Sequence, residues 1–538
     1  MLTDQVRNDI DCLWEQLRND GLVNNLTVLE QISYLLFVRM IDMQEEALEK
    51  NAVTSDGGFF TQDSDGQSLR WKNFKDFSDT DLYIHLKEKV YPYFADLGSK
   101  SIHSRELGQQ SIESLEFLGQ MESLGSISEY IVDASLEVRS PTVLVAAVKI
   151  VDSLPLNQAD IKGDIYEYLL SKLTIAGING QFLTPRHIID AMVEMVDPKP
   201  TDIICDPACG TGGFLARTVE YLNRINSSEA GACQDGDGDK ACSGDLLEPH
   251  RQHINSQMFW GFDIDSTMVG FSSMSMMLHG VSGANIFPLD SLGQSIKTSH
   301  PQQEHEFFDV MLAHPPFGVN LDESKINPDL FRMVKSKRTE LLFVAHTLRA
   351  LKPSGRAAVI VPNALLSGTS NAHLQLRKEL IENNQLQGVL SLPAGVFQPI
   401  TGIQTAILFF VKGGSTEHVW FYGLQADGCS LDNKRLPLKD ADSNDLSDAI
   451  GQWKQYQKLL KASASSGEIE QVFGDKTQKA FVVDASEIIS NGYDLSINRY
   501  KKEIFEEEVY KNPKVILQQL MSLEKEIMDD LKALENML

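Results

Sequence analysis

The hydrophobic positions along the chain follow two regimes, a helical one near the amino terminus and an alternating strand–helix one in the middle. Within residues 1–155 apolar residues recur every three or four positions, as from Leu13 to Met43, which predicts a mainly helical domain. Between residues 156 and 425 short apolar runs of strand length alternate with helical stretches. This alternation predicts an α/β fold with a doubly wound sheet.

The last part of the chain is more polar. Residues 426–500 are predicted to form a polar extension, and residues 501–538 a terminal helix that binds a partner. The apolar residues of this helix step by three or four: Ile516, Leu520, Leu523, Ile527, Leu531, Leu534 and Leu538. Such a seam packs either on the protein's own body or on a helix of another chain, and its charged flanks favour the partner.

A glycine-rich turn joins a short apolar strand to a helix. It begins at Asp206 and contains Gly210, Thr211, Gly212 and Gly213. Glycine lets the backbone adopt positive φ and approach a ligand, which would lie over the end of the strand and against the helix amino terminus. No Lys-Ser or Lys-Thr pair follows the last glycine, which argues against a phosphate-binding loop. The acid that opens the turn favours a ligand with an ammonium group.

Two later strands also end in carboxylates. Asp263 closes an apolar run, and one carboxylate there can accept both hydroxyls of a ribose, although capping of the next helix is the alternative. Asp265 is favoured as that cap. Asp290 follows a third strand, where it could accept from an exocyclic amine or be a solvated loop acid, and both interpretations are equally supported.

A fourth strand runs directly into His314-Pro315-Pro316-Phe317. Two prolines restrict the backbone, so that the side chain at 314 and the nearby carbonyls are held next to an aromatic face. This arrangement suits a planar amine, and the alternative is a rigid turn with Phe317 in the core. Upstream, Thr184 is predicted to cap a helix that begins at Pro185.

Composition restricts the partners. The formal net charge of −27 repels nucleic acid, so binding to DNA would require a basic partner or a local basic patch. The six cysteines lack metal-ligand spacing, which predicts a reducing compartment and no metal site. No apolar run is long enough to cross a bilayer, which predicts a cytoplasmic protein without membrane contact.

Several strings, taken in order, resemble the modification (methylase) subunits of type I restriction–modification systems, a class of N6-adenine DNA methyltransferase. The resemblance is strong from about residue 160 to 412. The matching strings span residues 163–170, 180–186, 206–215, 278–280, 290–292, 315–318, 351–356 and 402–405. Each string alone is common, whereas the ordered set is specific.

The resemblance implies a class I S-adenosylmethionine-dependent methyltransferase sheet, Rossmann-like, with a helical N-terminal domain and a C-terminal helix. The cofactor would be bound by the glycine-rich turn and by Gln181, Phe182, Leu183, Thr184, Pro185 and Arg186. It further implies that Asp263 holds the ribose and Asp290 the adenine amine of S-adenosylmethionine. A flipped target adenine would lie beside His314 and stack on Phe317.

The resemblance also implies partners. In such families two methylase subunits pair with one sequence-recognition (specificity) subunit, and a nuclease or translocase subunit can join. The terminal helix is a natural contact for the recognition subunit. This arrangement would bring so acidic a chain to DNA.

Two residues depart from the family pattern. Asp263 stands where the family has Glu, a change of one methylene. His314 stands where the family has Asn or Asp, and neutral His offers one acceptor nitrogen whereas protonated His offers none. The change is therefore expected to slow or abolish methyl transfer. The alternatives are a cofactor- and DNA-binding assembly subunit without transfer, or a methyltransferase for another nitrogen, such as a protein glutamine side chain.

Overall fold

The computed structural model describes residues 2–50, 59–61, 63–106, 131, 134–175, 184–229, 242–438, 444–502 and 513–535. The chain divides into two compact units, Met1–Tyr500 and Lys501–Leu538, which are described separately. Within the described residues, none of the helices is both long enough and apolar enough to pass through a membrane.

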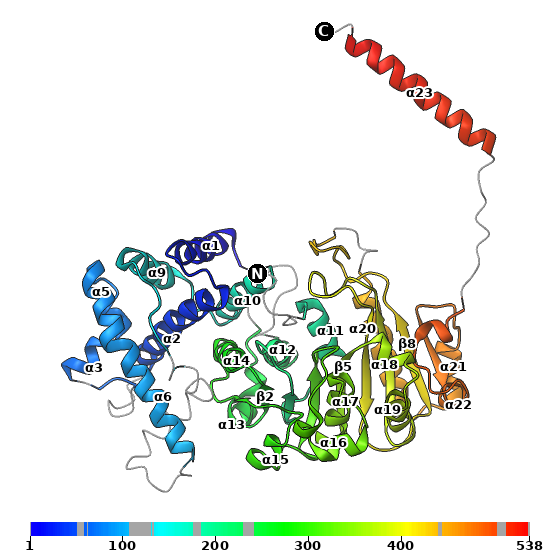
Figure 1. The fold of residues 1–538 in the computed structure, drawn as a ribbon, viewed down its shortest axis with the longest axis horizontal. Helices are drawn as coiled ribbons and strands as arrows, with labels where there is room; N and C mark the ends of the chain where they lie inside the picture. The colour runs from blue at the N-terminus through cyan, green and yellow to red at the C-terminus, as the bar shows by residue number, and fades with distance from the viewer. Residues whose placement is uncertain are drawn as a thin grey trace. The chain divides into compact units, whose positions relative to one another are not determined.

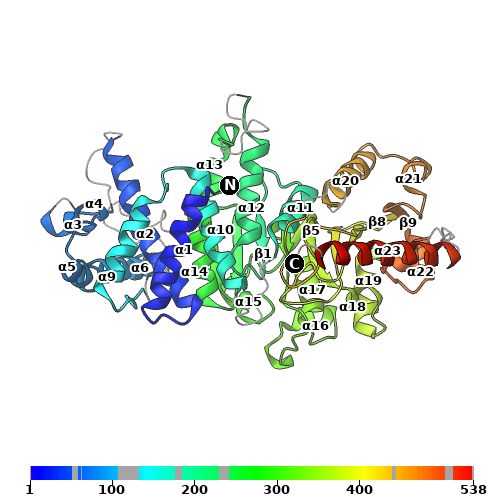
Figure 2. The same cartoon turned by 90° about the horizontal axis from the view of Figure 1, so that it is seen from above.

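The amino-terminal region is helical, as the apolar spacing predicts (Figure 1). Its helices bury Leu13, Leu36, Trp71 and Leu144 in one core. The elements are α1 (Asp4–Asn19), α2 (Asn25–Lys50), α3 (Ser64–Ser68), α4 (Trp71–Phe74), α5 (Asp79–His85), a π-helical turn (Leu86–Val90), α6 (Tyr91–Glu106), α9 (Pro141–Ser153) and α10 (Ala159–Ile175). Figures 1 and 2 both show α10 near α14 (Ser266–Leu278), and Met268, Met274 and Met277 of α14 join the same core.

The next region is a nine-stranded sheet with the order β3-β2-β1-β4-β5-β7-β6-β8-β9. The strands are β1 (Ile204–Asp206), β2 (Phe259–Asp263), β3 (Asn285–Pro288), β4 (Phe308–Ala313), β5 (Leu351–Pro362), β6 (Gln385–Leu392), β7 (Thr405–Val411), β8 (His418–Gly423) and β9 (Ala480–Asp484). The pairs among β1 to β5 are parallel, whereas β7 runs antiparallel to both β5 and β6. The predicted α/β class is confirmed.

Both faces of the sheet are buried. Along β4, Val310 and Leu312 enter one core, whereas Met311 and Ala313 enter the core on the opposite face. Parallel strands that are covered on both faces consist almost entirely of apolar residues, so they can be recognised in the sequence as short apolar runs. The flanking helices are α11 (Arg186–Val196), α12 (Gly213–Ile225), α13 (Arg251–Ser256), α14, α15 (Ser295–Ser299), α16 (Pro328–Met333), α17 (Thr339–Ala350), α18 (Asn363–Ser367), α19 (Asn371–Glu382), α20 (Leu446–Lys461), α21 (Ser466–Phe473) and α22 (Ala485–Ser490).

Three local features differ from the sequence interpretation. The segment 226–257 is rich in glycine and acidic residues and is loop-like in the sequence, yet residues 245–256 are helical, because Leu247 and Ile254 reach the core. The polar segment after residue 425 contributes β9 to the sheet, and Trp453 of α20 is buried and donates to the carbonyl of Met195. Cys242 is disulfide-bonded, so the expectation of reduced cysteines is wrong at that position.

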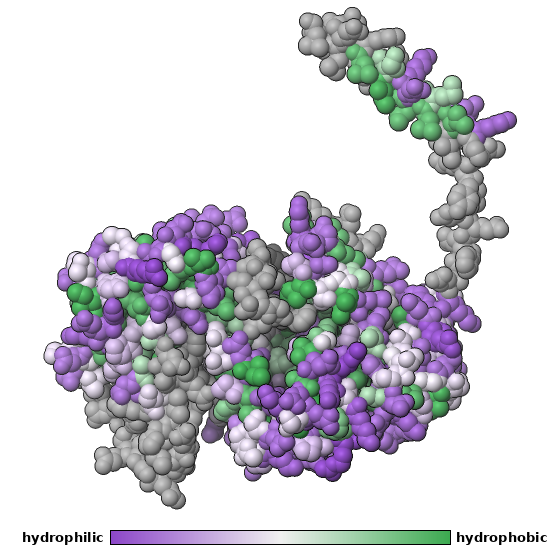
Figure 3. Space-filling view, viewed as in Figure 1, coloured by the Kyte–Doolittle hydropathy of each residue, from purple (hydrophilic) through white to green (hydrophobic). Residues whose placement is uncertain are grey.

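The second unit contains α23 (Pro513–Glu535), which confirms the terminal helix. Apolar side chains on it are more than half exposed: Leu517, Leu520, Met521, Leu523, Ile527, Met528 and Leu531. Figure 3 shows them as a green stripe between purple charged residues.

Candidate active site

A cavity of about 660 Å³ opens at the carboxyl ends of β1 and β4. Its walls come from α10, from the residues at the start of α11, from the turn between β1 and α12, and from two later loops around residues 397–400 and 429–436. The carboxyl end of a parallel sheet is where α/β folds bind ligands.

The cavity brings together many of the residues singled out from the sequence. Those that line it are Thr184, Pro185, Arg186, Asp206, Gly210, Thr211, Gly213 and His314. Those described but not lining it are Gly212, Asp263, Asp290, Pro315, Pro316 and Phe317. Gln181, Phe182 and Leu183 lie outside the described residues.

The glycines of the turn serve different purposes. Gly210 and Gly212 have φ of 51° and 80°, which explains glycine at both positions. A Cβ at Gly210 would meet no described atom within 4 Å, so this side of the turn is open. A Cβ at Gly212 would lie 2.4 Å from Oγ of Ser272, so this glycine lets α12 pack against α14.

Asp206 ends β1 and is only 1% exposed. Its Oδ1 accepts a hydrogen bond from the backbone N–H of Ala208 at 3.1 Å. Burial raises the pKa of Asp206 to about 8, and the nearby charge of Asp263 adds to this effect. The carboxyl is therefore mostly protonated at pH 7 and becomes a carboxylate when a cation approaches.

Asp263 and Asp290 lie at the same edge of the sheet, close to the turn. Asp263 accepts from the N–H of Gly210 at 2.9 Å, and burial raises its pKa. Asp290 accepts from the N–H of Leu292 at 2.9 Å, and the next residue, Ser291, donates to the carbonyl of Pro207 at 2.6 Å. Both acids thus help to hold the loops around the turn.

His314 follows β4 and is 7% exposed. Its ring centroid lies 5.3 Å from that of Phe317 and 4.7 Å from that of Phe397. Burial lowers the pKa of His314 to about 3, so the imidazole is neutral at physiological pH. The protonated form, which would oppose a cationic methyl donor, is thereby excluded.

The predicted N-cap role of Thr184 is wrong. Helix α11 begins at Arg186 with Pro185 at the N-cap position and without a side-chain capping bond. Instead, Oγ1 of Thr184 lies 2.8 Å from Nδ1 of His314. The hydroxyl is engaged by a residue 130 positions away, which local capping rules cannot anticipate.

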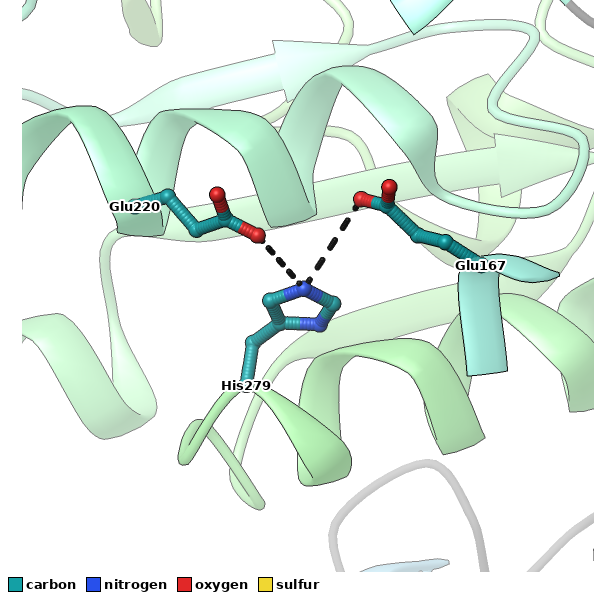
Figure 4. A group of neighbouring side chains, drawn as sticks. All are labelled: Glu167, Glu220 and His279. Atoms are coloured by element: carbon teal, nitrogen blue, oxygen red, sulfur yellow. Dashed lines mark hydrogen bonds and ion pairs between the residues drawn. The ribbon is translucent and has the colours of Figure 1, made fainter. Parts of the chain in front are cut away.

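A second polar cluster consists of Glu167, Glu220 and His279 (Figure 4), and Glu167 also lines the cavity. Nε2 of His279 lies 3.1 Å from a carboxylate oxygen of Glu220 and 4.0 Å from one of Glu167. Arg186 pairs with both glutamates, and Arg217 pairs with Glu220. Burial alone would raise the pKa of Glu220, but its partners His279, Arg217 and Arg186 lower it to about 2. Burial alone would lower the pKa of His279, but the hydrogen bond with Glu220 raises it.

This cluster has metal-ligand spacing, but its chemistry is that of an ion-pair network. Two guanidinium groups already balance the two carboxylates, so a divalent cation would have to displace or oppose them. The network instead fixes Arg186 at the wall of the cavity and joins α10 to α12 and α14.

Two elements of the cavity were not found from the sequence. Phe397, 3% exposed, packs against His314, and its position in a loop carries no periodic signal. The loop around Arg435 is held by Asp427, which is 1% exposed and accepts from His187 at 2.9 Å and from Arg435. Both depend on contacts between distant parts of the chain.

Comparisons with known proteins match most of the chain. The family model described as N-6 DNA Methylase matches residues 157–509, and the model of the HsdM N-terminal domain matches residues 6–121. The chain is 26% identical over 532 residues to the type I restriction enzyme EcoEI methylase subunit of Escherichia coli, covering 96% of this chain and 94% of the relative. It is 29% identical over 366 residues to the EcoKI methylase subunit of E. coli K12, covering 61% and 62%.

Solved structures share the fold. One is a chain from a structure described as the basis of complex assembly and conformational transition of the type I R-M system. It has a TM-score of 0.65 and 23% identity, with 99% and 98% of the two chains covered. Another is the type I restriction–modification methyltransferase subunit from Streptococcus thermophilus, with a TM-score of 0.59, 18% identity and 93% and 99% coverage.

Proposed function

The chain belongs to the N-6 DNA methylase family and is a type I restriction–modification methylase subunit, and we propose that its cavity binds S-adenosylmethionine and an extruded adenine. The enzyme is then a DNA (adenine-N6) methyltransferase. The observation that carries the proposal is that buried Asp206 and neutral His314, from the ends of adjacent strands, line one cavity.

The residues present fit the cofactor. Asp206 offers a carboxyl group that an ammonium ion would convert into a carboxylate, and the open side of Gly210 leaves room for a ligand against the backbone. Asp263 and Asp290 follow the next two strands, where they would hold the ribose and the adenine amine of the cofactor. S-adenosylmethionine supplies a sulfonium-bound methyl group, which is the electrophile.

The target side of the cavity is formed by His314. Its neutral ring packs against Phe397, which also lines the cavity and provides an apolar face beside an extruded base, and against Phe317, which does not line the cavity. When bound, the cofactor would supply its methyl group to the N6 amine of the base, and the proton displaced from N6 would pass to solvent. The protein binds, orients and excludes water from the two reactants.

We further propose that DNA is reached through partners. The apolar stripe of α23 would bind helices of a sequence-recognition subunit, which would also hold a second methylase copy. A nuclease or translocase subunit would join this assembly. The net charge of −27 favours a DNA-binding surface that is shared with a basic partner.

A second candidate function is a cofactor- and DNA-binding assembly subunit that does not transfer methyl groups. It is favoured by His314, because loss of an aligned acceptor can cost about 3 kcal/mol of transition-state stabilisation. If the chain is such an assembly subunit, His314→Asn should restore methyl transfer. If it is an active methyltransferase, His314→Asn should accelerate methyl transfer that already occurs.

The test is methyl transfer by the assembled complex. The complex is incubated with S-adenosylmethionine labelled in the methyl group and with DNA that lacks N6-methyladenine, and the nucleosides are analysed. We expect label in N6-methyladenine from the natural chain, at a lower rate than from His314→Asn. Label with His314→Asn alone establishes the assembly function, and absence of label from both rejects adenine methylation.

A further inference from the structure

We propose that Thr184 is a positioning residue that holds His314 in the neutral tautomer protonated on Nδ1, so that Nε2 acts as the acceptor for the target amine. The inference rests on the proposed methyl transfer and deepens it. It assigns to this chain a way of replacing the carbonyl acceptor that the family resemblance implies at position 314.

The geometry for this role is a hydrogen bond between two wall residues of the cavity. Oγ1 of Thr184 lies 2.8 Å from Nδ1 of His314, and both residues line the cavity. The hydroxyl makes no capping bond to α11, so its described side-chain partner is the imidazole. Phe317 and Phe397 pack around the ring, so its orientation is also determined by packing.

The tautomer decides what His314 can do. A neutral imidazole has one N–H donor and one acceptor nitrogen. If Nδ1–H donates to Oγ1 of Thr184, the acceptor is Nε2, which can receive a hydrogen bond from an amine. If the hydroxyl of Thr184 donates to Nδ1, the proton resides on Nε2, and two donors then face each other. The bond made by one ring nitrogen thus sets the chemistry of the other.

An amide side chain at position 314 does not have this dependence. Asn carries a carbonyl acceptor in every state, so it needs no partner to select a tautomer. The contribution of Thr184 to catalysis should therefore exist only while residue 314 is His. This provides a matched control, because any role of Thr184 in cofactor binding or folding would persist with Asn at position 314.

The first measurement is spectroscopic and does not depend on activity. The full chain, labelled with ¹⁵N in histidine, is observed by long-range proton–nitrogen correlation, and the His314 signals are assigned by their loss in His314→Asn. We expect the pattern of an Nδ1-protonated ring in the natural chain and a shift toward the other tautomer in Thr184→Val. An Nε2-protonated ring in the natural chain overturns the proposal.

The second measurement is kinetic. Thr184→Val and Thr184→Ser are made in the natural chain and in His314→Asn, and kcat and KM of the assembled complexes are compared. With His314 present, we expect Thr184→Val to lower kcat by about tenfold, in line with loss of one hydrogen bond, and Thr184→Ser to retain it. With Asn at position 314, the loss of kcat caused by Thr184→Val should be at least about fivefold smaller, and any loss that remains there measures the part of Thr184 in the cavity wall.

The outcomes are separable. An equal loss in both backgrounds, or a change in KM alone, shows a cofactor-binding or structural role and overturns the proposal. Absence of methyl transfer in every background defeats the proposed function, and the tautomer measurement then still decides whether Thr184 controls His314.

Discussion

The protonation of Asp206 predicts how cofactor affinity depends on pH. Burial raises the pKa of this carboxyl to about 8, whereas the ammonium of a bound amino acid requires the carboxylate. Binding near neutral pH must therefore release about one proton from Asp206. An exposed aspartate, with a pKa near 3.9, would release none.

The magnitude follows from the ionised fraction. With a pKa of about 8, the carboxylate fraction is about 1% at pH 6 and about 9% at pH 7. The affinity for S-adenosylmethionine should thus rise about ninefold over this unit. The range ends near pH 7 because the ligand's own α-amino group has a pKa of roughly 7.7 to 8.0.

The assay is calorimetric titration of the full chain with S-adenosylmethionine at pH 6 and 7, in two buffers of different ionisation enthalpy. We expect tighter binding at pH 7 and release of nearly one proton in both buffers. Asp206→Asn, which cannot titrate, should bind more weakly and lose the pH dependence. Equal affinity at both pH values with no proton release would refute the role of Asp206.

Three further predictions concern stability. The pKa of His314 is lowered to about 3 in the folded protein, so the unfolded state binds this proton more tightly. The contribution of neutral His314 to the free energy of unfolding is therefore complete above pH 6.5 and is lost as the pH falls toward 3. Between pH 7 and 5 the natural chain should lose about 2 kcal/mol more than His314→Asn in urea titrations, and equal losses would contradict this. Glu220→Gln breaks the ion-pair network and should lower the free energy of unfolding by about 3 kcal/mol, which is measured as a fall in the melting temperature. The control Glu229→Gln, at an exposed site, should change the melting temperature little. Residue 212 has positive φ, and Gly212→Ala would place a methyl group 2.4 Å from a neighbouring oxygen, so the yield of soluble folded protein should fall strongly. In the control Gly467→Ala, the new methyl group meets no described atom within 4 Å, and the yield should not fall. Similar yields for the two variants would show that the turn adapts.

The strands and the glycine-rich turn could be predicted because their signals are local. The buried runs 310–313 of β4 and 357–361 of β5 are apolar without interruption, and the positive φ of Gly210 and Gly212 favours glycine at those positions. Strand β9 was not predicted because it is a short strand within a polar segment, and its burial depends on pairing with β8.

The remaining parts of the site depend on contacts between distant residues. Thr184 satisfies the sequence rule for a helix cap, yet its hydroxyl bonds His314 across the cavity. Phe397 reaches the same ring from a loop after β6. The strongly lowered pKa of His314 also follows from burial, which the sequence does not display.

The account depends most on the cavity being the cofactor site, and the position of bound S-adenosylmethionine tests this most directly. An experimental structure of the chain with the cofactor should place its ammonium against Asp206 and its methyl group toward His314. Cofactor bound on another surface, with this cavity unfilled, would contradict the account.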